Sequence, residues 1–151
     1  MPHIWFLHDL VEVYADGEHS VLEMVAPPGD QPPLHVHHDG DEGFYVLEGE
    51  AMFWVGDVER RLGPGEFVLG PKGIPHTYRV TSETPARLIV TSSTGSFAAF
   101  VQAYGAPAER AELPTGVVPD VERLGRLAAE HGIELLGPPG MLPSELSAAA
   151  R

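Results

Sequence analysis

The sequence predicts an all-β fold, a sandwich or small barrel of short strands, with helices confined to the C-terminal part. Short runs rich in Val, Leu and aromatic residues recur between residues 4 and 91. Gly and Pro, at 17 and 15 of the 151 residues, separate these runs and supply the turns between them. Regular short strands punctuated in this way are typical of sandwiches and barrels.

The length and a change in composition predict one domain with two parts. A chain of 151 residues is about one domain and can bury a core of its own. Residues 1–94 are expected to form the barrel, and residues 95–151 a helical extension that packs on its outside. We see no internal repeat, so we expect a single barrel unit.

The first strands are predicted from apolar runs and one hairpin signal. Residues 4–7 form a short apolar edge strand, which either folds onto its own domain or pairs with a second subunit. Residues 11–14 alternate in polarity, Asp16-Gly17 is a two-residue hairpin signal, and residues 20–26 form the returning strand.

The middle of the chain continues the strand pattern. Residues 43–47 are apolar on both faces, which favours a buried strand. Residues 51–55 and 58–62 flank Gly56-Asp57, whose glycine-first order fits a type II′ hairpin turn. The remaining predicted strands cover residues 67–69, 76–80 and 87–91.

Helices are expected only after residue 95. Residues 97–104 lack helix breakers and are followed by Gly105 as a stop signal. Asp120 is a good N-cap for a second helix, whose apolar residues recur at helical spacing until Gly132. The Gly-Pro-Pro-Gly run at residues 137–140 is expected to end regular structure.

Four polar side chains are predicted to converge on one centre. His35 and His37 are two residues apart on a predicted strand and therefore face the same side. The turn-forming residues 38–41 bring Glu42 onto the adjacent strand, and His76 arrives from later in the chain. Three imidazoles and a carboxylate suit a divalent first-row transition metal with open coordination positions, and open positions imply chemistry or ligand capture.

These residues resemble the cupin family. The first cupin motif, G-x5-H-x-H-x3 or x4-E-x6-G, is filled by Gly29, His35, His37, Glu42 and Gly49. The second motif, G-x5-P-x-G-x2-H-x3-N, is matched by Gly65, Pro71, Gly73 and His76, whereas its last position is Val80 instead of Asn. The resemblance implies a small jelly-roll barrel, also called a double-stranded β-helix, and a metal ion held by His35, His37, Glu42 and His76. The departure at Val80 concerns a supporting contact, because that position is not a ligand in the family.

Among single-domain cupins, the chain is most similar to bacterial flavonol dioxygenases of the quercetinase type. The likeness rests on the ligand set and on the C-terminal segment after the aromatic helix near Phe97. It implies one divalent ion (Fe, Mn, Co, Ni or Zn), an aromatic or enolic substrate, and O2. It also implies that Glu42 serves as base as well as ligand, accepting the substrate proton.

A pocket is predicted from the parity of residues on the ligand-bearing strands. Phe44 and Val46 follow Glu42 in steps of two, and Tyr78 and Val80 follow His76 likewise. Regular strands would place all four toward the metal, although each can equally be barrel filling. Met52 and Trp54 add to a pocket that accepts apolar and aromatic groups.

Charge and composition exclude several functions. Nine basic against 22 acidic residues give a net charge of −13, which argues against binding of nucleic acid or an anionic membrane surface. The absence of cysteine excludes disulfides, thiolate metal sites and a cysteine nucleophile. No signal peptide is visible, so we expect a cytoplasmic protein, and the apolar edge at residues 4–7 favours a homodimer.

Two alternatives to the dioxygenase remain open from the sequence, because fold and metal do not specify a reaction. The first is a zinc-dependent isomerase or cyclase, resembling polyketide cyclases of the same fold, which dependence on oxygen would separate. The second is a metal-bearing module that binds a small molecule without turnover.

Overall fold

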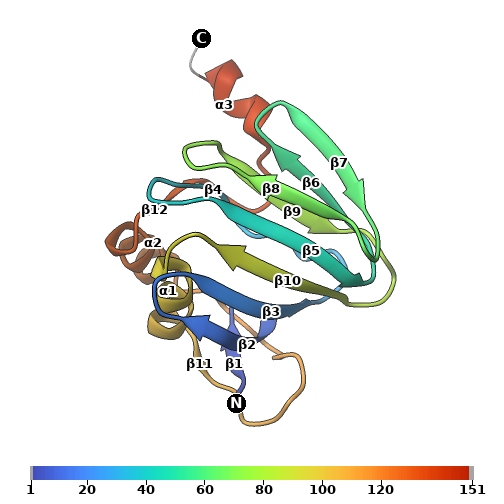
Figure 1. Ribbon diagram of the computed structural model, residues 1–151, viewed down its shortest axis with the longest axis vertical. Helices are drawn as coiled ribbons and strands as arrows, with labels where there is room; N and C mark the ends of the chain where they lie inside the picture. Colours follow the sequence, from blue (N-terminus) through green and yellow to red (C-terminus); the bar gives the residue numbers. More distant parts are fainter. Residues whose placement is uncertain (1, 150–151) are drawn as a thin grey trace.

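The computed structural model describes residues 2–149 and consists mainly of strands in two antiparallel sheets (Figure 1). The order across the larger sheet is β11-β1-β2-β3-β10-β5-β8, and across the smaller sheet β12-β4-β9-β6-β7. The strands are β1 (Ile4–Phe6), β2 (Asp9–Asp16), β3 (Ser20–Ala26), β4 (Leu34–His37), β5 (Glu42–Glu48), β6 (Ala51–Val55), β7 (Val58–Leu62), β8 (Phe67–Gly70), β9 (His76–Val80), β10 (Ala86–Ser92), β11 (Ala106–Pro107) and β12 (Ile133–Gly137). The predicted all-β jelly-roll class is confirmed.

The helices are α1 (Ser96–Tyr104), α2 (Val121–Glu130) and α3 (Pro143–Ala149). In Figure 1, α1 and α2 lie together beside one end of the sheets, and α3 lies beyond β6 and β7 at the other end. Asp120 caps α2 as predicted, because its carboxylate accepts a hydrogen bond from the Arg123 backbone N–H. Among the described residues, no helix combines the length and the apolar composition needed to span a bilayer.

Two short strands of the C-terminal segment join the sheets, which the sequence did not predict. β11 pairs with β1, so the apolar edge at residues 4–7 is covered by its own chain. β12 pairs with β4, the strand that carries the first two histidines. The expected end of regular structure at residues 137–140 was wrong, because α3 follows. The division at residue 94 stays a prediction.

The hydrophobic core lies between the two sheets and continues under α1 and α2. Leu22, Val46, Phe53 and Leu88 contribute fully buried side chains from both sheets, and Val101 extends the core into α1. Alternate residues of β3 and β10 are buried, as strands with one face toward a core require. This packing fixes the strands from which the polar cluster projects.

The structure explains why two positions of the sequence motifs are glycine. Gly49 has a φ of 80°, and a Cβ there would lie 2.8 Å from the Cα of Ala86. Gly73 has a φ of 81°, and its backbone N–H donates to the His37 carbonyl over 2.9 Å. Because L side chains rarely adopt this conformation, glycine at residue 73 lets the loop before His76 dock onto β4.

Candidate metal centre

Three strands bring the four predicted ligands together. His35 and His37 lie on β4, Glu42 begins β5, and His76 begins β9 directly opposite His35 in the sheet register. The turn before Glu42 is tied to the loop before His76, because Asp41 Oδ1 accepts a hydrogen bond from the Lys72 backbone N–H over 2.8 Å. The arrangement therefore rests on backbone pairing and on this turn contact.

The four ligand atoms form a compact buried cluster. All lie within 4.8 Å of one another. The Nε2 atoms of His35, His37 and His76 are 3.8, 3.2 and 2.9 Å from the same carboxylate oxygen, Oε1 of Glu42. His37, Glu42 and His76 are each no more than 2% exposed, so solvent contributes little to their charge balance.

Hydrogen bonds on the far side of two rings set their tautomers. His35 Nδ1 donates to the Pro33 carbonyl over 2.8 Å, and His76 Nδ1 donates to the Ile74 carbonyl over 3.0 Å. A carbonyl oxygen only accepts, so Nδ1 carries the proton in both rings. In a neutral imidazole, Nε2 then presents a lone pair toward the Glu42 carboxylate, and a cation between these groups would satisfy both.

The lowered pKa of Glu42 also fits a site that binds a cation. Burial raises the pKa of Glu42, but the three histidines around it, His37 first, outweigh that effect and hold the pKa well below its usual range. His37 Nε2 is buried and makes no hydrogen bond, although it lies 3.2 Å from the carboxylate oxygen. An ionised carboxylate and an unpartnered imidazole nitrogen are groups that a divalent ion would satisfy.

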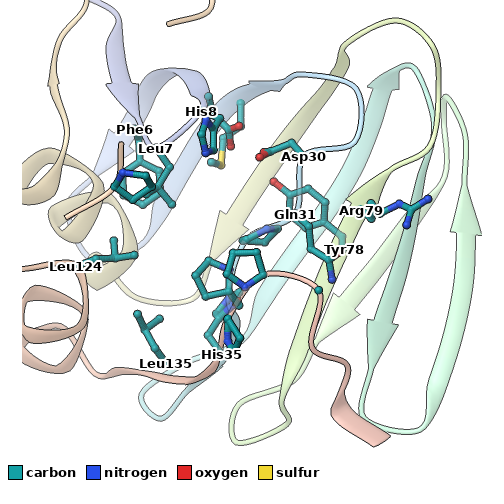
Figure 2. Close-up of a pocket in the computed structure, with 18 of the residues that line it drawn as sticks. Phe6, Leu7, His8, Asp30, Gln31, His35, Tyr78, Arg79, Leu124 and Leu135 are labelled. Atoms are coloured by element: carbon teal, nitrogen blue, oxygen red, sulfur yellow. The ribbon is translucent and has the colours of Figure 1, made fainter. Parts of the chain in front are cut away.

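The cluster opens into a cavity of about 1040 Å³ (Figure 2). His35 and Glu42 lie in its wall, and most of the lining is aromatic, aliphatic or proline. α1, α2 and β12 supply part of this wall through Phe97, Leu124 and Leu135. The C-terminal segment therefore helps to form the cavity, in addition to packing on the barrel.

The six predicted pocket residues are placed differently from one another. Phe44 and Tyr78 line the cavity, with their ring centroids 5.9 Å apart. The remaining four are not part of the lining: Val46, Met52, Trp54 and Val80. Val46 and Val80 are buried in the core, and Met52 and Trp54 alternate with the buried Phe53 on β6. Which of the six contacts a substrate stays a prediction.

Three polar residues of the cavity were missed from the sequence. Asp9 begins β2, and Asp30 and Gln31 lie in the loop between β3 and β4. No motif spacing relates Asp9 to Asp30. The only sequence signal for Asp9 as a cavity residue is that it is a single acidic residue beside an apolar run. Burial and the charges of Asp9, Asp30 and Glu42 hold the pKa of the Tyr78 phenol well above its usual range, so this hydroxyl stays neutral.

Comparison with known proteins agrees with this geometry. A family model described as a cupin domain matches residues 22–92, which include all four ligands. The crystal structure of TT1209 from Thermus thermophilus superposes with a TM-score of 0.52 at 31% identity, covering 56% of this chain and 83% of that one. The chain belongs to the cupin family. The predicted resemblance to the cupin family is confirmed.

Two curated relatives of this cupin are enzymes. Quercetin 2,3-dioxygenase of Bacillus subtilis (strain 168) is 32% identical over 105 residues, covering 68% of this chain and 31% of that protein. Dimethylsulfoniopropionate lyase DddQ of Ruegeria pomeroyi is 42% identical over 78 residues, covering 51% of this chain and 38% of that protein. The cupin thus spans about a third of the length of each. The chain is therefore similar to proteins named for two different activities.

Proposed function

We propose that this cupin is a metal-dependent dioxygenase that cleaves a flavonol-like or other aromatic, enolic small molecule with O2. The observation that carries the proposal is the convergence of three imidazole Nε2 atoms and one buried carboxylate on the wall of an apolar cavity. The 32% identity to quercetin 2,3-dioxygenase supports the choice of reaction. A site of four protein ligands leaves positions on the ion for substrate.

His35, His37, Glu42 and His76 would hold the ion, which is one of Fe, Mn, Co, Ni or Zn. When bound, it would supply Lewis acidity that lowers the pKa of a substrate hydroxyl. Neutral imidazoles suit this task, because three of them with one carboxylate leave a net charge near +1 on a divalent ion. The carbonyls of Pro33 and Ile74 keep two of the rings oriented for binding.

The substrate would be positioned by the aromatic wall. Phe44 stands between the ligand His76 and Tyr78, at centroid distances of 5.9 Å to each ring. An aromatic substrate stacked there would have one edge toward Glu42, whose carboxylate would accept the proton of the substrate hydroxyl. The apolar lining would exclude water from the reacting centre.

The test is an aerobic assay with flavonols on protein loaded separately with each candidate metal. The expected result is loss of substrate absorbance matched by oxygen consumption for at least one metal, and loss of that activity in Glu42→Gln. No absorbance change with any of Fe, Mn, Co or Ni would contradict the dioxygenase.

A second candidate is a metal-dependent reaction that needs no oxygen. The 42% identity to DddQ, a lyase, favours it, and the zinc-dependent isomerase or cyclase predicted as an alternative falls in the same class. The same side chains would act as ligands and base. Product formation at an unchanged rate under argon would select this candidate over the dioxygenase.

A second copy of the chain is the proposed partner. The edge strand β1 is covered by β11, so the apolar surface for a dimer has to come from elsewhere. The exposed side chains of Tyr45, Phe67 and Leu69 on the paired strands β5 and β8 provide such a surface. Light scattering should give twice the chain mass of 16.3 kDa, and a monomer mass would contradict the proposal.

A further inference from the structure

A second polar cluster lies on the wall of the same cavity as the metal ligands. It consists of Asp9, Asp30 and Gln31, none of which belongs to the metal cluster. Figure 2 shows Asp30 and Gln31 close to the ring of Tyr78, whereas Arg79 points away from them. The cavity therefore has polar side chains at two separate places on an otherwise apolar wall.

Two atoms of this cluster lack partners. Asp9 is only 4% exposed, yet within residues 2–149 its Oδ1 has no hydrogen-bond partner, and the buried Nε2 of Gln31 has none there either. None of the ion pairs found among residues 2–149 includes Asp9 or Asp30. Buried polar groups are nearly always paired, and those left over call for a partner outside the chain.

The unpaired atoms are one acceptor and one donor. Burial, together with the charge and hydrogen bond of Asp30, raises the pKa of Asp9 well above its usual range. The free Oδ1 of Asp9 can accept a hydrogen bond, and Nε2 of Gln31 is an uncharged donor. A hydroxyl group donates and accepts at once, so it can satisfy both, whereas an ammonium group leaves the Gln31 donor unpaired.

A chain of ring contacts relates this cluster to the metal centre. Tyr78 contacts Phe44, and Phe44 contacts His76, each at a centroid distance of 5.9 Å. Figure 2 shows Asp30 beside the ring of Tyr78, and the charges of Asp9 and Asp30 both act on the Tyr78 phenol. An aromatic ligand in the cavity can thus have one polar end at Glu42 and another at Asp9.

We propose that Asp9 and Gln31 form a subsite that selects ligands carrying a hydroxyl group remote from the metal-binding end, with Asp30 positioning Asp9. The inference rests on the proposed function in one respect, namely that the ligand is aromatic. It does not require oxygen, turnover or a metal ion.

The test measures binding of a matched set of flavones to the purified protein by calorimetry under argon. The set contains flavone, each monohydroxyflavone except the 3-hydroxy compound, and an aminomethyl analogue at the preferred position. Without the 3-hydroxyl, none of these compounds presents the enolate that the dioxygenase proposal requires. At least one monohydroxyflavone is expected to bind about tenfold or more tightly than flavone, because its hydroxyl pairs two buried groups.

Variants at residue 9 separate recognition from a structural role. Asp9→Leu is similar in size and has no acceptor, so it should reduce the hydroxyl preference to within about twofold while leaving flavone binding intact. Asp9→Asn keeps an acceptor oxygen and should retain most of the preference. Glu18→Leu, at an exposed position of the β2–β3 hairpin, is the matched surface control and should behave as the wild type.

Each outcome decides the proposal. Equal affinity for flavone and every hydroxyflavone, no binding by any member of the set, or an undiminished preference in Asp9→Leu would overturn it. Tighter binding of the aminomethyl analogue would overturn the assignment to a hydroxyl. A preference that depends on Asp9 without flavonol turnover would uphold the subsite and reject the dioxygenase, and turnover without such a preference would do the reverse.

Discussion

Two carboxyl groups of the same cavity, Glu42 and Asp9, are buried to nearly the same depth, but their pKa values are shifted in opposite directions. Glu42 is 1% exposed and Asp9 is 4% exposed. Histidines surround Glu42 and hold its pKa well below the usual range, whereas burial and a second carboxyl, Asp30, raise the pKa of Asp9 well above it. Burial raises the pKa of both acids, so the opposite outcomes come from their partners.

The largest expected effect comes from removing a partner of Glu42. In His76→Ala, the carboxylate loses its closest imidazole, at 2.9 Å, and the site loses one of four ligands. Bound metal should fall from about one ion per chain to less than about a tenth, measured by elemental analysis after dialysis. His19→Ala changes an exposed histidine and should retain the metal. Equal metal content in the two variants would contradict the assignment.

The next effect is loss of metal in acid. Imidazole groups have an ordinary pKa of about 6.5, and protons compete with the metal for them, so occupancy should fall below about pH 6. The lowered pKa of Glu42 means that its ionised form stabilises the fold above its unfolded-state pKa, and that this stability is lost as pH falls through the folded-state value. Retention of the metal through a wash at pH 4 would contradict the proposed ligand set.

The fold is expected to become more stable when Asp9 loses its carboxyl group. Because the pKa of Asp9 is raised, the folded state binds more protons than the unfolded state. The free energy by which Asp9 destabilises the fold therefore grows as pH rises from the unfolded-state pKa toward the folded-state pKa. Asp9→Leu should therefore raise the free energy of unfolding by about 1–3 kcal/mol at pH 7 and by less at pH 4. Urea denaturation at the two pH values measures this difference. A loss of stability at pH 7 would show that Asp9 holds the fold together.

The smallest effect concerns the orientation of one ligand ring. A Cβ at Gly70 would lie 3.2 Å from His76 Nδ1, so Gly70→Ala should displace the ring by a few tenths of an ångström. We expect a several-fold loss of metal affinity, below the roughly 10–100-fold typical of losing a hydrogen-bond partner of a ligand. Gly125→Ala, in α2, is the control, because among the described residues the added methyl group would meet nothing within 4 Å beyond its chain neighbours and the backbone of its own helix. Unchanged affinity in Gly70→Ala would show that the ring has room to move.

The metal cluster was predictable from the sequence because most of it is local. His35 and His37 share one strand, and a short turn delivers Glu42 to the next, so their convergence follows from strand geometry. His76 lies far away in sequence, and only the second family motif identified it. The strands from β1 to β10, the hairpin at Gly56 and the first two helices were predictable for the same reason, since their signals lie within each segment.

The remaining features depend on tertiary contacts that carry no local signal. β12 is a strand because it pairs with β4, although its sequence follows a helix and precedes a Gly-Pro-Pro-Gly run. Asp9 and Asp30 meet because β2 begins near the loop after β3. Phe44 and Tyr78 line the cavity and Val46 and Val80 do not, because parity predicts the face of a strand and not where along the strand a cavity ends.

The most direct test of the central claim is the anomalous scattering of a crystal grown from protein purified without added metal. We predict one peak per chain, at about 2.0–2.2 Å from the Nε2 atoms of His35, His37 and His76 and from a carboxylate oxygen of Glu42. A structure in which these side chains are ordered around no peak, or in which the metal lies elsewhere, would contradict it.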